Sequence, residues 1–155
     1  MTKLRFRGMA ALLASVTLLI SACEKEEGEN DTKISSYHSE ESHNAGENCM
    51  NCHRSGGPGE GWFTIAGTVY DEDQNTPYPG ATVRLYTGPG GSGTLKATVE
   101  VDLKGNFYTT EQIDFGDGLY AEAEGETSVK HMSSPLTTGQ CNQCHGESTG
   151  SIHVK

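Results

Sequence analysis

Apolar and polar positions divide the chain into three zones. Residues 10–20 form the longest apolar run, whereas residues 24–60 contain few large apolar side chains. From residue 62 onward, short runs of β-branched and aromatic residues alternate with Gly, Pro and Asp. No stretch after the apolar run repeats with the 3.6-residue period of an amphipathic helix. The pattern predicts a domain made of strands, preceded by a leader.

Five short runs predict the strands. They lie at residues 62–70, 81–86, 95–101, 107–110 and 119–124. Turns are predicted at residues 71–80, 88–93, 104–105 and 116–118, where Gly, Pro and Asp gather. Alternation is clearest in residues 82–86, where Val83 and Leu85 share one face. Short, regularly spaced strands without helices predict an all-β fold, a small antiparallel β-sandwich.

The same region resembles a known family. The resemblance rests on residues 65–71 (IAGTVYD), 79–85 (PGATVRL), 105–108 (GNFY) and 118–120 (GLY). In order and spacing they resemble the carboxypeptidase regulatory-like domain, a transthyretin-like or immunoglobulin-like β-sandwich. The resemblance covers residues 62–126 and implies a fold but no activity, because the matching positions are turn and core residues.

The start of the chain predicts export. Residues 1–22 have a basic beginning, an apolar stretch and small residues before Cys23, which is typical of a signal peptide. Residues 20–23 (ISAC) resemble the lipobox of bacterial lipoproteins, which implies that Cys23 is lipidated and becomes the mature N-terminus. The alternative is an ordinary signal peptide with a chance cysteine near its cleavage site.

Composition and motifs predict five segments. These are the signal peptide (1–22), an acidic disordered tether (23–36), an N-terminal segment with two cysteines (37–60), the β-sandwich (61–130) and a C-terminal segment with two cysteines (131–155). The tether prediction depends on the acidic run that follows Cys23, which has no apolar side chain to bury.

The segments 37–60 and 131–155 each contain one C-x-x-C-H motif, which predicts that both are haem-binding segments. Cys49, Cys52 and His53 form the first motif, and Cys141, Cys144 and His145 form the second. This spacing is the attachment signature of haem c. The two thiols reach the two vinyl groups of one porphyrin, and the adjacent histidine binds the iron from the proximal side. Two motifs predict two covalently bound haem c groups.

Zinc and disulfides are the alternative uses of these cysteines. Zinc ribbons separate their C-x-x-C pairs by about 15–20 residues, but here the whole predicted sandwich lies between the pairs. Zinc also requires no histidine directly after each second cysteine. A disulfide within C-x-x-C is strained and easily reduced. With Cys23 assigned to lipid, haem attachment accounts for all five cysteines.

Each haem iron has a second axial position. Four of the six histidines remain for it, and we expect His43 and His131 to be the distal ligands, with His153 the first reserve and His38 the second. Met132, next to His131, is the alternative thioether ligand and would raise the potential. Iron atoms with both axial positions filled predict electron transfer rather than catalysis.

The net charge narrows the choice of partners. The formal charge is −10, and loss of the basic leader makes the mature chain more negative still. This excludes unassisted nucleic-acid binding, which depends on Lys and Arg, and favours basic redox partner proteins.

Together with its two flanking segments, the β-sandwich region resembles exported dihaem cytochrome lipoproteins. The resemblance implies electron transfer in the periplasm or at the cell exterior. It also implies a location at the outer membrane or cell surface, and contact with other multihaem cytochromes. The alternatives are a haem enzyme with one open iron site, reducing peroxide or a nitrogen oxide, and a homopolymeric filament in which a spare histidine binds a neighbour's iron.

Overall fold

The computed structural model describes residues 30–155. The predicted signal peptide and Cys23 lie outside these residues. The described part has eight strands and two 3-10 turns: η1 (Cys49–Asn51), β1 (Ile65–Tyr70), β2 (Thr82–Tyr86), β3 (Leu95–Glu100), β4 (Asn106–Thr109), β5 (Tyr120–Glu124), β6 (Val129–His131), β7 (Gly139–Gln140), η2 (Cys141–Gln143) and β8 (Ile152–His153). No helix in residues 30–155 is long and apolar enough to cross a membrane.

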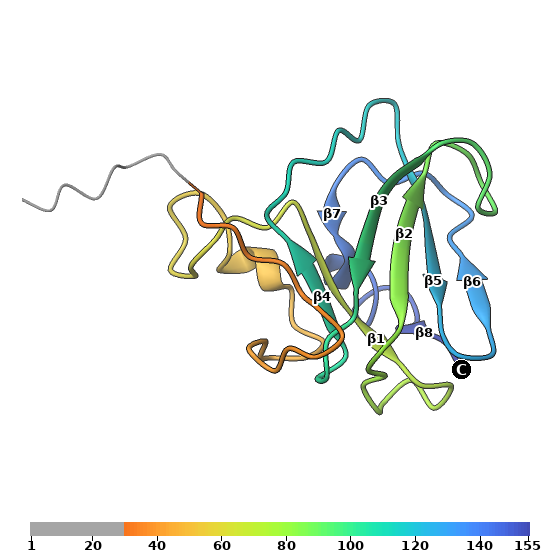
Figure 1. Cartoon of the computed structure of the whole chain (residues 1–155), viewed down its shortest axis with the longest axis horizontal. Coiled ribbons are helices and arrows are strands. Elements are labelled where there is room, and N and C mark those ends of the chain that lie inside the picture. The colour runs from red at the N-terminus through yellow and green to blue at the C-terminus, as the bar shows by residue number, and fades with distance from the viewer. Residues whose placement is uncertain (1–29) are drawn as a thin grey trace, which may run out of the picture.

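The strands form two sheets, which confirms the predicted all-β fold (Figure 1). One sheet has the order β3-β2-β5-β6 and is antiparallel throughout. In the other, β1 pairs antiparallel with β4, while β7 and β8 each pair with β1 in parallel over two residues. The parallel pairings differ from the expected antiparallel sandwich. They arise because the C-terminal segment returns alongside β1 and runs in its direction.

Alternating side chains build the core. Val83 and Leu85 are 3% and 0% exposed and belong to the main cluster, so the predicted inward face of β2 is confirmed. Ile65, Val69 and Phe107 supply the facing side chains from β1 and β4, and each is fully buried. Removal of this apolar surface from water is the main stabilising contribution in such a fold.

All five predicted strands are present; four are shorter than expected, and β4 has the expected length but begins one residue earlier. β6, β7 and β8 were not predicted, because they are two or three residues long and their sequences do not alternate. All three residues of β6 are exposed. Backbone pairing with β5 and β1, rather than apolar periodicity, defines them, and pairing of this kind leaves no pattern in the sequence.

The segment after residue 30 is ordered on the domain, so the predicted disordered tether is wrong for residues 33–36. Ile34 forms an antiparallel bridge with Thr109, and the Ser35 amide donates to the Tyr108 carbonyl at 2.9 Å. Ser35 is 2% exposed. The unpaired edge of β4 supplies the hydrogen bonds that an isolated polar segment lacks. Residues 23–29, the rest of the predicted tether, lie outside the described part.

Candidate functional site

The two C-x-x-C-H motifs have the same local fold. Each starts with a 3-10 turn at its first cysteine. In the first motif the Cys49 carbonyl accepts hydrogen bonds from the amides of Cys52 (3.1 Å) and His53 (3.0 Å). In the second, the Cys141 carbonyl accepts from Cys144 (3.2 Å) and His145 (3.0 Å). The shared carbonyl folds each loop back on itself, which brings both thiols and the histidine to one side of a short turn.

Both motif histidines are held through the same ring nitrogen. His53 Nδ1 lies 2.8 Å from the Glu60 carbonyl, and His145 Nδ1 lies 2.8 Å from the Gly150 carbonyl. A backbone carbonyl only accepts, so each Nδ1 carries the proton and Nε2 keeps a free lone pair. Metal-bound histidines in proteins commonly have their other ring nitrogen fixed in this way. Both imidazoles are therefore prepared to bind a metal ion through Nε2.

Packing fixes the plane of the His53 ring. Phe63 stacks on it with centroids 4.2 Å apart and an interplanar angle of 9°. Phe63 in turn stacks on Tyr108 at 4.8 Å. Gly59 also lies against the ring, because a Cβ built there would be 2.8 Å from His53 Nδ1 and 2.9 Å from Cε1. The ring is restrained by Phe63 and by the Gly59 backbone.

The first and second cysteines of each motif differ in environment. Cys52 and Cys144 are exposed, whereas Cys49 and Cys141 are partly covered, and none of the four is in a disulfide. Burial raises the pKa of the Cys49 thiol. Burial, and to a lesser extent the neighbouring Cys49 thiol, raises the pKa of Cys141 to about 12. The first cysteines are thus neutral thiols near one another, and the second cysteines face solvent.

A cavity of about 810 Å³ lies beside the first motif. Cys49, Cys52, His53 and His43 all line it, and the His43 and His53 ring centroids are 5.8 Å apart. The two rings are tilted by 41° to each other, so two imidazoles that could hold one haem lie side by side at this cavity. The structure places the expected distal ligand His43 beside its motif.

Its neighbour Ser42 anchors the loop that presents His43. Ser42 is 8% exposed, its Oγ accepts from Asn106 Nδ2 at 2.9 Å, and its carbonyl accepts from Lys104 Nζ at 2.8 Å. The loop turns back at Asn44 and Gly46, which have φ values of 52° and 88°. Left-handed backbone of this kind suits Gly and is tolerated by Asn.

A second cavity, of about 590 Å³, lies beside the other motif. Its lining includes Cys141, Cys144 and His145, together with all three candidates for the distal position: His131, Met132 and His153. His153 Nδ1 lies 3.0 Å from the Ser151 carbonyl, which leaves its Nε2 free. The structure therefore gathers the predicted residues of the second site, and it offers three distal donors where the first site has His43.

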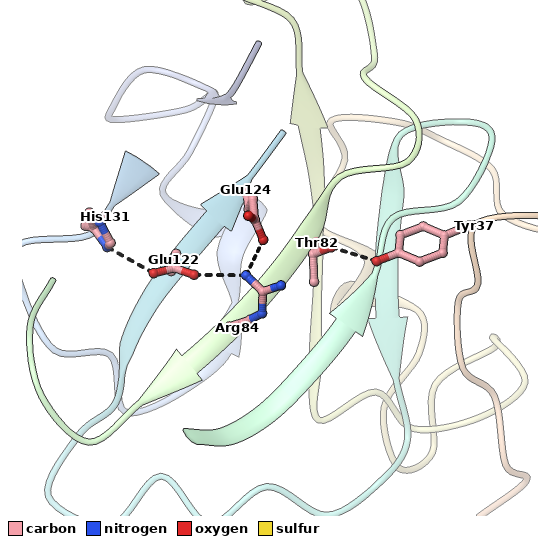
Figure 2. A network of polar contacts seen from close by, with 6 residues as sticks. All are labelled: Tyr37, Thr82, Arg84, Glu122, Glu124 and His131. Atoms are coloured by element: carbon pink, nitrogen blue, oxygen red, sulfur yellow. Dashed lines mark hydrogen bonds and ion pairs between the residues drawn. The ribbon is translucent and has the colours of Figure 1, made fainter. Parts of the chain in front are cut away.

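Figure 2 shows how His131 is held. It lies directly opposite Glu122 in the β5–β6 register, and Glu122 lies opposite Arg84 in the β2–β5 register. His131 Nδ1 is 3.5 Å from Glu122 Oε2, and Arg84 is 3.1 Å from Glu122 Oε1 and also pairs with Glu124. Glu122 is 9% exposed. The carboxylate holds one nitrogen of the ring and leaves Nε2 as the other.

The second pair of residues in Figure 2 ties the N-terminal segment to the same sheet. Tyr37 Oη and Thr82 Oγ1 are 2.7 Å apart, and the Tyr37 amide donates to Glu100 Oε2 at 3.0 Å. His38, the second reserve, is exposed and is absent from the lining of both cavities. The structure thus separates His38 from the other candidates.

Several residues of the site were not found by sequence reasoning. Glu60 and Gly150 contribute only backbone carbonyls, which no residue type indicates. Glu122 is far in sequence from the motif it adjoins, and Phe63 was assigned only to a strand. The sequence offered one sign of these contacts to the motif histidines: a glycine follows each histidine within six residues, Gly59 after His53 and Gly150 after His145.

The donor set of each motif is one that could hold haem c. Each motif has its own cavity, a pair of thiols and an imidazole with a free Nε2, as covalent haem attachment requires. Within residues 30–155 no group of three or more His, Cys, Asp or Glu side chains is arranged to hold a metal ion. Comparison with known protein families, curated proteins and solved structures finds no match for this chain.

Proposed function

We propose that this chain is a dihaem c-type cytochrome that carries electrons. The observation that supports the proposal is the repeated geometry of the two motifs. In each, the histidine amide bonds to the first cysteine carbonyl, Nδ1 bonds to a later carbonyl, and the motif lines its own cavity. A structural disulfide or an isolated thiol pair has no need of an imidazole oriented in this way.

In this proposal the cysteines attach the haems and the histidines bind the irons. The thiols of Cys49 and Cys52 would hold one haem, and those of Cys141 and Cys144 the other, each S–H adding across a vinyl group to give a thioether. His53 Nε2 and His145 Nε2 would bind the irons on the proximal side. When bound, haem c supplies an iron that gains and loses single electrons. His43 would supply a second imidazole to the haem of the first site, and His131, with Glu122 behind it, is our choice at the second.

The test is a count of haems per chain. The mature chain is expressed with a haem-attachment system, and pyridine haemochrome absorbance is combined with intact mass. We expect two covalent haems. Cys52→Ala and Cys144→Ala should each leave one haem with a single thioether and an altered haemochrome band, whereas Ser55→Ala, at an exposed residue next to the first motif, should change nothing. A wild-type chain with no covalent haem would refute the proposal.

A haem enzyme is the second candidate, and the second site favours it. Within residues 30–155 no imidazole packs against the His145 ring in the way that His43 lies beside His53, with ring centroids 5.8 Å apart. An open iron would bind peroxide or a nitrogen oxide. Carbon monoxide added to the reduced protein decides between them. An unchanged spectrum supports the electron carrier, and a new band from half of the haem supports the enzyme.

The proposal extends to location and partners. We propose a lipid anchor at Cys23, export to the outer membrane or cell surface, and basic redox proteins or other multihaem cytochromes as partners. The excess of acidic residues supports a basic partner, because complementary charge accelerates association. Mass spectrometry of the mature N-terminus, with Cys23→Ser as control, tests the anchor. Negative-stain microscopy of protein released from cells tests the homopolymeric filament.

A further inference from the structure

A buried amide inside the second motif binds the segment of the first. Asn142 is 3% exposed. Its Oδ1 accepts from the Thr68 amide at 3.0 Å, and its Nδ2 donates to Thr68 Oγ1 and to the Glu47 carbonyl, both at 3.0 Å. Glu47 lies two residues before Cys49. One side chain between the two cysteines of one motif therefore holds the backbone that leads into the other.

Thr68, at the centre of this network, belongs to the rigid sheet. Its Oγ1 accepts from the Gly46 amide at 2.8 Å and donates to Asn106 Oδ1 at 2.7 Å. Asn106, opposite Thr68 in the β1–β4 register, donates from Nδ2 to Ser42 Oγ at 2.9 Å. Thr68 and Asn106 are 1% and 2% exposed. The network thus also anchors the loop that presents His43.

The two motifs also touch at their first turns. Asn48 caps η1 and its Nδ2 donates to Gln140 Oε1 at 3.3 Å, and Gln140 is the residue before Cys141. Both 3-10 turns pack against β1. Cys49 and Cys141 consequently lie near one another, whereas Cys52 and Cys144 face solvent. Porphyrins bound to these thiols would approach each other at the first cysteine of each motif.

We propose that Asn142 is a positioning residue that fixes the two C-x-x-C-H segments as one unit, so that two attached haems exchange electrons as a coupled pair. The inference rests on the proposed function. A charge gained by one iron acts on the other through an interior of low dielectric constant, and the effect depends on a short and constant separation. Independent carriers would need no buried amide that joins their attachment loops.

The first arm of the test uses the full mature chain without haem. Amide hydrogen exchange is measured for the wild type, Asn142→Ala and the control Gln143→Ala, whose side chain is exposed in the same loop. We expect Asn142→Ala to lower protection of the Thr68 amide about ten-fold or more, since this amide loses its buried acceptor Oδ1. Protection at Gly46, whose amide bonds to the Thr68 hydroxyl, should fall less. Gln143→Ala should leave both unchanged. Unchanged protection in Asn142→Ala overturns the proposal.

The second arm is a redox titration of the haem-loaded chains. We expect the wild type and Gln143→Ala to deviate from two independent one-electron steps, and Asn142→Ala to move towards independence. A curve that is the same in all three overturns the proposal even where protection falls. Should Asn142→Ala not fold, Asn142→Asp keeps the shape and the Oδ1 acceptor but loses the donor to both the Glu47 carbonyl and Thr68 Oγ1, and it adds a buried charge. Failure of the proposed function would look different: no haem on the wild type, with the exchange result intact.

Discussion

Substitution of Gly59 by alanine tests whether packing fixes the proximal imidazole of the first site. The added Cβ would lie 2.8–2.9 Å from three atoms of the His53 ring, whereas ordinary contact begins at 3.4 Å. The ring must therefore retreat by about 0.5 Å or the loop must open. The ring cannot retreat towards Phe63, which already stacks on it at 4.2 Å. Gly59 has no positive φ, so the effect is steric rather than a matter of backbone strain.

The expected cost follows from this geometry. Overpacking of a filled site costs about 1–3 kcal/mol, and loss of the hydrogen bond from His53 Nδ1 to Glu60 is included in that range. Urea unfolding of the haem-free chain should show Gly59→Ala destabilised by this amount. Nitrogen NMR of the imidazole should show His53 Nδ1 losing its fixed proton. In the haem-loaded chain, the displaced Nε2 should raise the high-spin fraction at the first site.

Gly150 provides the matched control. It follows the motif histidine of the second site and supplies the carbonyl that His145 Nδ1 contacts, but a Cβ there would meet only Gln74 Oε1, at 3.1 Å. The glutamine end can move aside, so Gly150→Ala should keep the stability and spectra of the wild type. Wild-type stability together with an unchanged His53 tautomer in Gly59→Ala would refute the packing argument.

Three further predictions concern the haem-free chain. Its unfolding free energy, measured by urea unfolding, should fall as pH rises from about 9 towards 12, because the folded pKa of Cys141, about 12, exceeds the ordinary 9.0. The slope is at most about 1.4 kcal/mol per pH unit. Cys141→Ala should flatten this pH dependence, and a flat curve for the wild type would contradict the prediction. At pH 8, iodoacetamide followed by peptide mass spectrometry should label Cys144 well before Cys141, and equal rates would show that burial does not protect the first cysteine. Glu122→Ala should cost about 1–3 kcal/mol, because it leaves its arginine and histidine without a buried partner; exposed Glu126→Ala is the control, and equal urea midpoints for the two variants would count against the network.

The sheet was predictable where side chains alternate. Val83 and Leu85 define the inner face of β2 from sequence, and the structure buries both. β6, β7 and β8 could not be found, since two or three residues carry no period and their partners are distant in the chain. The order of residues 33–36 was missed for the same reason: the edge of β4, which they cover, lies more than half the domain away in sequence.

The candidate site divides along a similar line. The motif residues and His43 could be named from spacing and count, because a covalent attachment signature is local. Asn142 could not, since the position between two cysteines accepts many residue types and its role depends on Thr68 and Glu47, which only folding brings near. Glu122 was missed because a carboxylate in a strand usually faces solvent. Residues that act within a short motif can be predicted from the sequence, whereas the distant residues that hold them in position cannot.

The docking of residues 33–36 on β4 limits how far the domain can travel from its proposed anchor. With the proposed lipid at Cys23 and the chain docked from Lys33, nine residues would lie between the two points, and the ten Cα–Cα steps across them span at most about 35 Å when fully extended. Lys33 also lines the first cavity. The first haem would therefore remain within a few tens of ångströms of the membrane surface. The proposed electron acceptor would then have to share that membrane or bring its own cofactor within that radius.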